Sequence, residues 1–183
     1  MIIQNNTFTN TETGEVFDGK PKQFDIFPDD KYLFWAKKHF RKSYQDIKLS
    51  DIVGTGEDFH KIHLLFEYLH NDTNTLMVRV SRNKIRIADI EDVSNIIGLN
   101  VRHTKEFINR MICKHVIAEN ISRVGDNVIT KYVVNPLFQN TSKHLTADLY
   151  FLFEESLNNY LPKWVVQKFH EIGNIKSESK KGE

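Results

Sequence analysis

Apolar residues recur at helical spacing in two stretches of the first half of the chain. From Pro28 onward, an apolar stripe that extends to Phe40 predicts a helix, because proline suits the first turn and the stripe follows a 3.6-residue period. The glycines around 54–56 interrupt the chain. A second helix is predicted over 57–70, and it ends before the turn-forming run 71–74.

Two segments instead show the two-residue alternation of β-strands. Residues 76–87 alternate on both sides of a central polar pair, which predicts a β-hairpin. Its outward positions carry Arg79, Arg82, Lys84 and Arg86. Such charges favour protection of an exposed strand edge, with contacts to DNA as the alternative. Residues 117–134 predict a second hairpin, closed by Asn135-Pro136.

Between the hairpins lie two predicted helices joined by a tight turn. The first runs over 89–97, with Asp89 as its cap and Gly98 as its stop. The second runs over 101–115 and divides into an apolar and a polar face at about 100° per residue. We expect its polar face to be exposed.

The remaining chain predicts flanking elements around this centre. Apolar residues from Leu145 to Leu157 form one helical stripe, and a further helix opens at 161–165 and runs to about Glu171. The chain therefore divides into a polar N-terminal segment over 1–27 with a possible hairpin, a folded domain over 28–171, and a disordered tail over 172–183. The fold class is α+β and mostly helical.

The order of the central elements predicts a winged helix-turn-helix. A short helix (89–97), a turn with glycine, an amphipathic helix (101–115) and a hairpin (117–134) follow one another as in that fold. There the second helix lies in the DNA major groove and the hairpin is the wing.

Charge refines this interpretation. The 183 residues carry 25 basic and 24 acidic side chains, a net charge of +1, so general coating of nucleic acid is excluded and a local patch is required. Between Arg79 and Lys131 there are ten basic and six acidic residues. One cysteine excludes an internal disulfide, and no apolar run is long enough to span a membrane, so we expect a cytoplasmic protein.

The candidate DNA-binding residues fall in three groups. Base edges would be read from the start of the helix 101–115, where arginine and lysine suit guanine, asparagine suits adenine and glutamate suits cytosine: Asn100, Arg102, His103, Lys105, Glu106 and Asn109. Arg110 and Lys114 would meet phosphate, and Arg123 and Lys131 would serve from the wing. The alternatives are a solvated helix face and a charged edge strand.

The chain also resembles a known group of proteins. The run 87–100, the wing end "KYVVNPLF" over 131–138, the aromatic run 149–153 and the "LPKWV" at 161–165 resemble winged-helix proteins of Gram-positive phages and plasmids. These include RepL-like replication initiators and MarR-like phage regulators. The resemblance implies DNA binding by the chain.

Other functions fit the sequence less well. His60, His63, Glu67 and His70 are spaced so that their side chains could meet on one helical face, but they are more typical of surface histidines than of zinc ligands. We find no glycine-rich phosphate loop and no hydrolase or metalloprotease motif, so no enzyme, metal or cofactor is expected.

Three functions therefore remain open. The first is a transcription regulator of a phage or mobile element that binds double-stranded DNA, as a homodimer through its aromatic terminal helices. The second is a replication initiator at an origin. The third, of another class, is an adaptor that binds a host polymerase or replication factor without specific DNA recognition.

Overall fold

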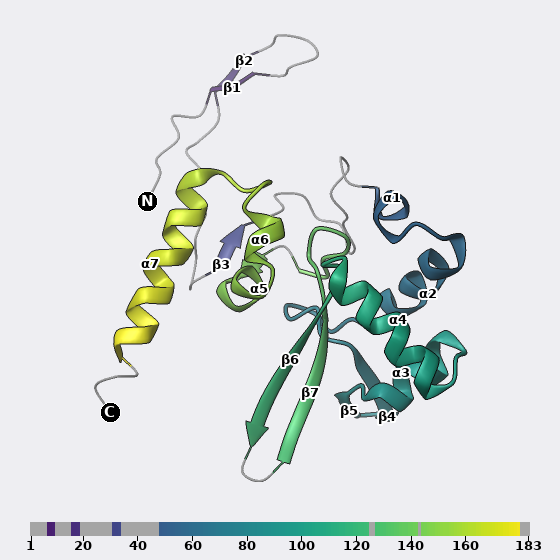
Figure 1. The fold of residues 1–183 in the computed structure, drawn as a ribbon. Helices are drawn as coiled ribbons and strands as arrows, with labels where there is room; N and C mark the ends of the chain where they lie inside the picture. The colour runs from purple at the N-terminus through teal and green to yellow at the C-terminus, as the bar shows by residue number, and fades with distance from the viewer. Residues whose placement is uncertain are drawn as a thin grey trace.

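The computed structural model contains helices and antiparallel strands, and it describes residues 7–9, 16–18, 31–33, 48–124, 127–142 and 144–179. The α+β class is therefore confirmed. Two buried apolar clusters organise the chain, one around the central helices and the other around the C-terminal helices. In Figure 1 these two groups of helices lie on opposite sides of a long hairpin.

Four helices build the first cluster: α1 (Leu49–Val53), α2 (Gly56–Phe66), α3 (Ile90–Ile97) and α4 (Val101–Cys113). The side chain of Thr55 caps α2 by accepting a hydrogen bond from the backbone N–H of Asp58. Gly98 ends α3 in the left-handed conformation with φ of 70°, where a side chain would be strained. The two helices predicted over 89–97 and 101–115 are present with a turn between them, α4 ending at Cys113, whereas α1 was not expected from the sequence and α2 ends four residues early.

Both predicted hairpins are present. Strand β4 (Met77–Ser81) pairs with β5 (Lys84–Ile87), and β6 (Ile117–Val124) pairs with β7 (Asn127–Val134). The β6–β7 hairpin keeps its register from Ile117 opposite Val134 to the tip and projects away from the helices (Figure 1). We call this hairpin the arm.

An isolated β-bridge, Thr75 opposite Val133, anchors the base of the arm to the segment 74–76. The backbone N–H of Leu76 donates to the Tyr132 carbonyl, and that of Val134 donates to the Asn74 carbonyl, each over 2.9 Å. The fully buried Asn74 amide donates to the carbonyls of Val134 and Gln139, at 3.1 and 2.6 Å. These bonds fix the direction in which the arm leaves the body.

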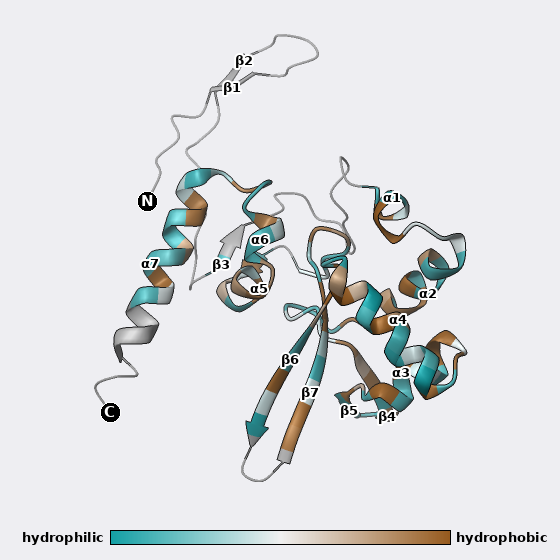
Figure 2. Cartoon of the chain, in the orientation of Figure 1, coloured by the Kyte–Doolittle hydropathy of each residue, from teal (hydrophilic) through white to brown (hydrophobic). Residues whose placement is uncertain are grey.

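The second cluster is formed by β8 (His144–Thr146), α5 (Ala147–Leu152), α6 (Glu154–Leu157) and α7 (Lys163–Ser179). The buried rings of Tyr150 and Phe169 stack with centroids 4.3 Å apart and join α5 to α7. Figure 2 shows apolar residues on α5 and on part of α7. The stripe predicted from Leu145 to Leu157 is therefore buried, but it is divided between a strand and two short helices.

The structure corrects the predicted helix that begins at Pro28. Residues 31–33 form strand β3 (Lys31–Leu33), which pairs antiparallel with β8, Lys31 lying opposite Thr146. Hydrogen bonds to a strand more than 100 residues away outweigh the local helical period here. The rest of the predicted helix lies outside the described residues.

Helix α7 (Lys163–Ser179) runs into the segment 172–183, for which the sequence predicts disorder. Helix α7 continues to Ser179, and Ile172 is only 7% exposed because it packs in the second cluster. Burial of this side chain extends the helix beyond the point where the sequence becomes polar. Residues 180–183 lie outside the described part of the chain.

In the N-terminal segment 1–27, the structure describes two short strands. Strand β1 (Thr7–Thr9) pairs antiparallel with β2 (Val16–Asp18), in agreement with the possible hairpin. The other residues of this segment lie outside the described part.

Candidate nucleic-acid interface

Helix α4 buries one face and exposes the other. Thr104, Phe107, Ile108 and Met111 are buried, whereas Arg102, Lys105, Glu106 and Asn109 are exposed. The predicted division of this helix is therefore correct. It leaves a polar helical face that a ligand can reach.

The start of α4 is capped by one of the predicted base-reading residues. Asn100 Oδ1 accepts a hydrogen bond from the backbone N–H of His103 at 2.9 Å, and Asn100 Nδ2 lies 3.4 Å from His103 Nδ1. Both side chains are exposed at the entrance of the helix. Because the cap occupies Asn100 Oδ1, contact with a base would have to compete with helix capping.

Lys105 is a cation on the exposed face that has no partner among the described residues, and we call such a cation open. The neighbouring Arg102 directs Nε to Glu106 Oε1 at 3.4 Å, so that a carboxylate stands beside this exposed arginine. Lys105 and Asn109 have no hydrogen-bond or ionic partner within the described residues. A single unpaired lysine therefore dominates the electrostatics of this face.

The two residues predicted to meet phosphate make contacts within the fold. Arg110 Nη2 donates to Asp58 Oδ1 at 3.0 Å, and the Asp58 side chain is only 9% exposed. Lys114 Nζ donates to the Val53 carbonyl at 2.6 Å. These contacts link α4 to α2 and α1, and neither is visible in the sequence, because the partners are 52 and 61 residues apart.

The two cations predicted on the wing lie on opposite faces of the arm. Arg123 stands opposite Val128, and Lys131 stands opposite Asn120. Since positions 120 and 123 have different parity in one strand, their side chains point to different faces. Arg123 and Lys131 therefore do not form one contact surface.

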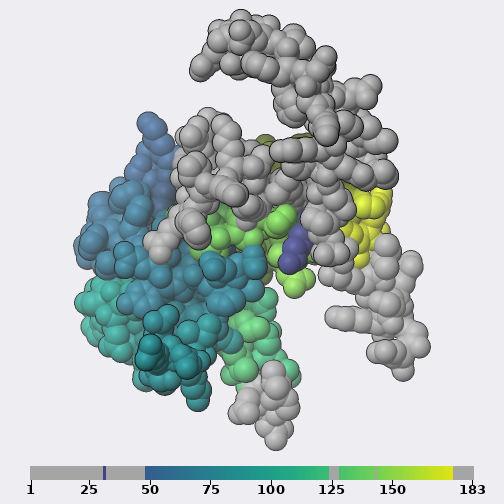
Figure 3. All heavy atoms as spheres, turned by 180° about the vertical axis from the view of Figure 1, so that it is seen from behind, coloured from purple at the N-terminus to yellow at the C-terminus, as the bar shows by residue number. Residues whose placement is uncertain are grey.

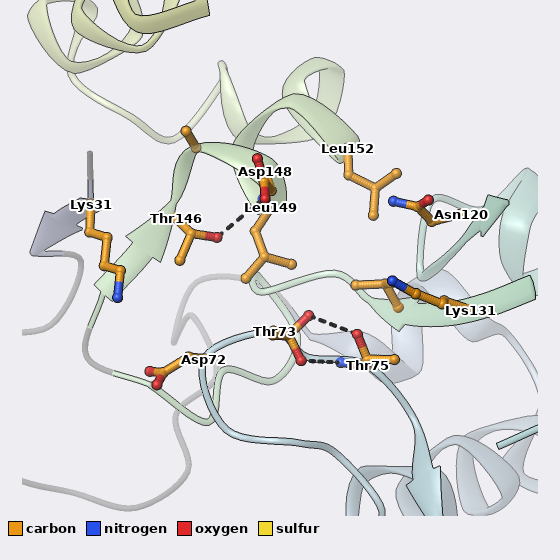
Figure 4. Close-up of a pocket in the computed structure, with 12 residues that line it drawn as sticks. Lys31, Asp72, Thr73, Thr75, Asn120, Lys131, Thr146, Asp148, Leu149 and Leu152 are labelled. Atoms are coloured by element: carbon orange, nitrogen blue, oxygen red, sulfur yellow. Dashed lines mark hydrogen bonds between the residues drawn. The ribbon is translucent and has the colours of Figure 1, made fainter. Parts of the chain in front are cut away.

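Lys131 lines a cavity between the arm and the C-terminal helices. The cavity has a volume of about 430 Å³, and Asn120, Asp72 and Lys31 also line it. Figure 4 shows that these polar side chains come from different segments around the apolar Leu149. The described groups make this a mixed polar and apolar cleft between the two clusters.

In the β4–β5 hairpin, one cation has ionic partners and three have none among the described residues. Arg86 donates to Asp92 through Nη2 at 2.8 Å and to Asp89 through Nη1 at 3.2 Å. These contacts, with Asp92 first, raise the pKa of Arg86. Arg79, Arg82 and Lys84 are exposed, and we find no ionic partner for them in the described chain.

Asp89 combines with Asp92 in a capping box at the start of α3. The N–H of Asp92 donates to Asp89 Oδ1 at 2.9 Å, and the N–H of Asp89 donates to Asp92 Oδ2 at 2.9 Å. The bond from the Asp92 amide, with the charge of Arg86, lowers the pKa of Asp89. Through Arg86, the two carboxylates of the box also link the β4–β5 hairpin to the start of α3.

Two buried tyrosines have raised pKa values. Burial raises the pKa of Tyr132 at the base of the arm, and the charge of Glu119 adds to the effect. In the C-terminal cluster, burial and then Glu154 raise the pKa of Tyr150 to about 12, against a donated bond to Asn158 Oδ1 at 2.8 Å. Both phenols are neutral at physiological pH and serve packing.

The remaining chemical candidates do not converge. Cys113 is exposed and free. Across the described ranges, no group of three or more histidine, cysteine or acidic side chains is placed to hold a metal ion. Nor does any described helix have the length and apolar character needed to cross a membrane.

Comparison with family models, with curated proteins and with solved structures finds no match to this chain.

Proposed function

We propose that this chain is a winged-helix protein that binds double-stranded DNA, with α4 in the major groove, and that it regulates transcription in a phage or mobile element. One observation carries the proposal. The segment 74–76 between α2 and α3 is bridged to β7, with Thr75 opposite Val133, and α3, α4 and the arm then follow around one core in the order of that fold.

The charge on α4 indicates how strongly one copy would bind. Lys105 is the open cation on the exposed face, since Arg102 is paired with Glu106 and Arg110 with Asp58. Few phosphate contacts give weak, salt-sensitive affinity. We therefore propose that two copies bind together and present two α4 helices to half-sites about one helical turn apart.

The test is a selection of bound sequences from a random double-stranded DNA pool at near-physiological salt. We expect the full chain to enrich a motif with two-fold symmetry. Lys105→Ala should weaken binding to that motif by about 1 to 3 kcal/mol, because a base-edge or phosphate contact is lost. Lys163→Ala is the matched control, because Lys163 is an exposed lysine at the start of α7, in the other cluster.

The results separate the proposed functions. Without an enriched motif, the specific-regulator proposal fails. An enriched motif repeated at an origin instead of standing in a promoter favours the replication initiator. An adaptor function is the second candidate, because internal contacts occupy Arg102, Arg110 and Lys114. It expects only non-specific DNA affinity, unchanged by Lys105→Ala.

A further inference from the structure

The outer edge of β7 is paired only at its base. There the backbone groups of Tyr132 and Val134 form hydrogen bonds with those of Leu76 and Asn74. Beyond Leu76 the chain forms β4, which pairs with β5 and not with β7. Alternate residues of an antiparallel strand direct their backbone groups to the same edge, so Val128 and Thr130 continue this row. Their outward N–H and C=O groups have no backbone partner among the residues that the structure describes.

This open edge lines a groove of about 350 Å³. The arm contributes Val128, Thr130 and Tyr132, and the junction of β5 and α3 contributes Ile87 and Ile90. Figures 1 and 3 show that the arm and the β4–β5 hairpin project from the same end of the body. No residue of α4 lines the groove, so it is separate from the candidate DNA-binding face.

Exposed aliphatic side chains stand on the two hairpins that flank the groove. Val80 and Ile85 on the β4–β5 hairpin are 55% and 50% exposed, and Ile121 and Val128 on the arm are each 61% exposed. Open strand edges that carry aliphatic residues are surfaces on which another strand can add.

The charges around this surface are mostly positive. Arg79, Arg82 and Lys84 on one hairpin and Arg123 on the other are exposed and lack an ionic partner in the described chain. The carboxylate of Asp89, which also lines the groove, is bonded to Arg86 and to backbone amides. Glu119 is the one acidic residue within strands β4, β5, β6 and β7, and Asp126 lies between β6 and β7 in the chain, outside the described residues.

We propose that this groove binds an extended acidic segment of a partner protein, which adds as a strand to the outer edge of β7. Its backbone would bond to Val128 and Thr130, its aliphatic residues would cover the exposed valines and isoleucines, and its alternate acidic residues would pair with the cations. A second copy of this chain would bring cations against cations. Nucleic acid would leave the aliphatic side chains exposed.

The experiment is a selection from a displayed library of random peptides of about ten residues, the upper end of strand lengths, against the full chain. Enriched peptides are then synthesised and their affinity measured by fluorescence anisotropy. Thr130→Pro removes an outward N–H without taking a bond from β6, because that N–H points away from β6. Thr130→Val is its matched control, because it keeps the N–H.

We expect enriched peptides to alternate acidic and aliphatic residues. Thr130→Pro and the double variant Arg79→Ser/Lys84→Ser should each weaken their binding about tenfold, the effect of roughly one charge-assisted or edge hydrogen bond with its packing. Thr130→Val and Lys105→Ala should leave it unchanged. Two peptides, methylated on the odd-numbered or on the even-numbered backbone nitrogens, test the same edge with the unaltered protein. The peptide whose methyl groups replace the N–H groups that face β7 should no longer bind.

Several results would overturn the proposal. These are a library without enrichment, enriched peptides without acidic residues, and binding that survives both Thr130→Pro and both methylated peptides. A loss of DNA affinity in Arg79→Ser/Lys84→Ser would assign the surface to nucleic acid. A dimer that Thr130→Pro dissociates would assign it to a second copy.

Discussion

The two halves of α4 use their cations for different purposes. In the first half, Lys105 is open and Arg102 has an exposed partner on its own helix. In the second half, Arg110 and Lys114 reach back to α2 and α1. Residues of the same charge on one helix thus divide between an exposed surface and contacts within the fold, and the partner, not the residue type, decides which.

The largest effect should come from the second half. Arg110→Ala leaves the nearly buried carboxylate of Asp58 without its cation, which should lower the free energy of unfolding by about 1 to 3 kcal/mol. Arg102→Ala removes an arginine whose partner is exposed and should change it by less than about 0.5 kcal/mol. Urea denaturation of both variants measures the difference.

Two further results would break this contrast. Equal stability of the two variants would show that the Arg110–Asp58 pair does not support the fold. A fall of about 1 in the salt dependence of DNA binding in Arg110→Ala would restore Arg110 as a phosphate contact.

A smaller effect is expected at Lys114. Lys114→Met keeps the length of the side chain but loses the hydrogen bond to the Val53 carbonyl, so unfolding should become easier by about 0.5 to 1.5 kcal/mol. Because that bond holds the end of α1, amide hydrogen exchange in α1 should accelerate more than in α3. Equal protection of α1 in the wild type and in Lys114→Met would show that Lys114 does not hold α1, and Lys114 would then not differ from the exposed cations of the first half of α4.

These contacts also explain how far the sequence could be interpreted. Helices α3 and α4 and the two hairpins follow from local period, caps and turns, and their bounds agree with the structure. Strand β3 has three residues and a partner at 144–146, so no local pattern distinguishes it from a helix.

The candidate site divides in the same way. The exposed face of α4 was predictable because helical geometry fixes it. The partners of Arg110 and Lys114 were not, because they depend on how α1 and α2 pack against α4. The faces of Arg123 and Lys131 follow from the register of the arm, which the sequence places only to within a residue or two.

The capping box of α3 gives a pH-dependent test of a cation that serves the fold. Asp89→Ala removes the cap and one partner of Arg86, and should cost about 1 kcal/mol near neutral pH. Because the pKa of Asp89 is lowered in the folded protein, the carboxylate contributes stability above its ordinary value of 3.8, and this contribution is lost as the pH falls through the folded value.

Thermal unfolding of the wild type and Asp89→Ala at a series of pH values measures this contribution. The two proteins should converge in stability as the pH falls below 3.8, the ordinary pKa of Asp89. A constant difference across that range would show that the charge of Asp89 does not stabilise α3.

The smallest effect on stability should come from the first half of α4, at Glu106. Glu106→Gln frees Arg102 from an exposed ion pair and should change the free energy of unfolding by less than about 0.5 kcal/mol. If α4 lies against DNA, the same change removes a negative charge from the contact face and should strengthen non-specific binding severalfold at low salt, with a steeper salt dependence. Lys105→Ala should instead weaken non-specific DNA binding and make its salt dependence less steep. Unchanged DNA affinity in both variants would show that the first half of α4 is merely solvated. The second half would then contact α1 and α2, and the first half would bind no DNA.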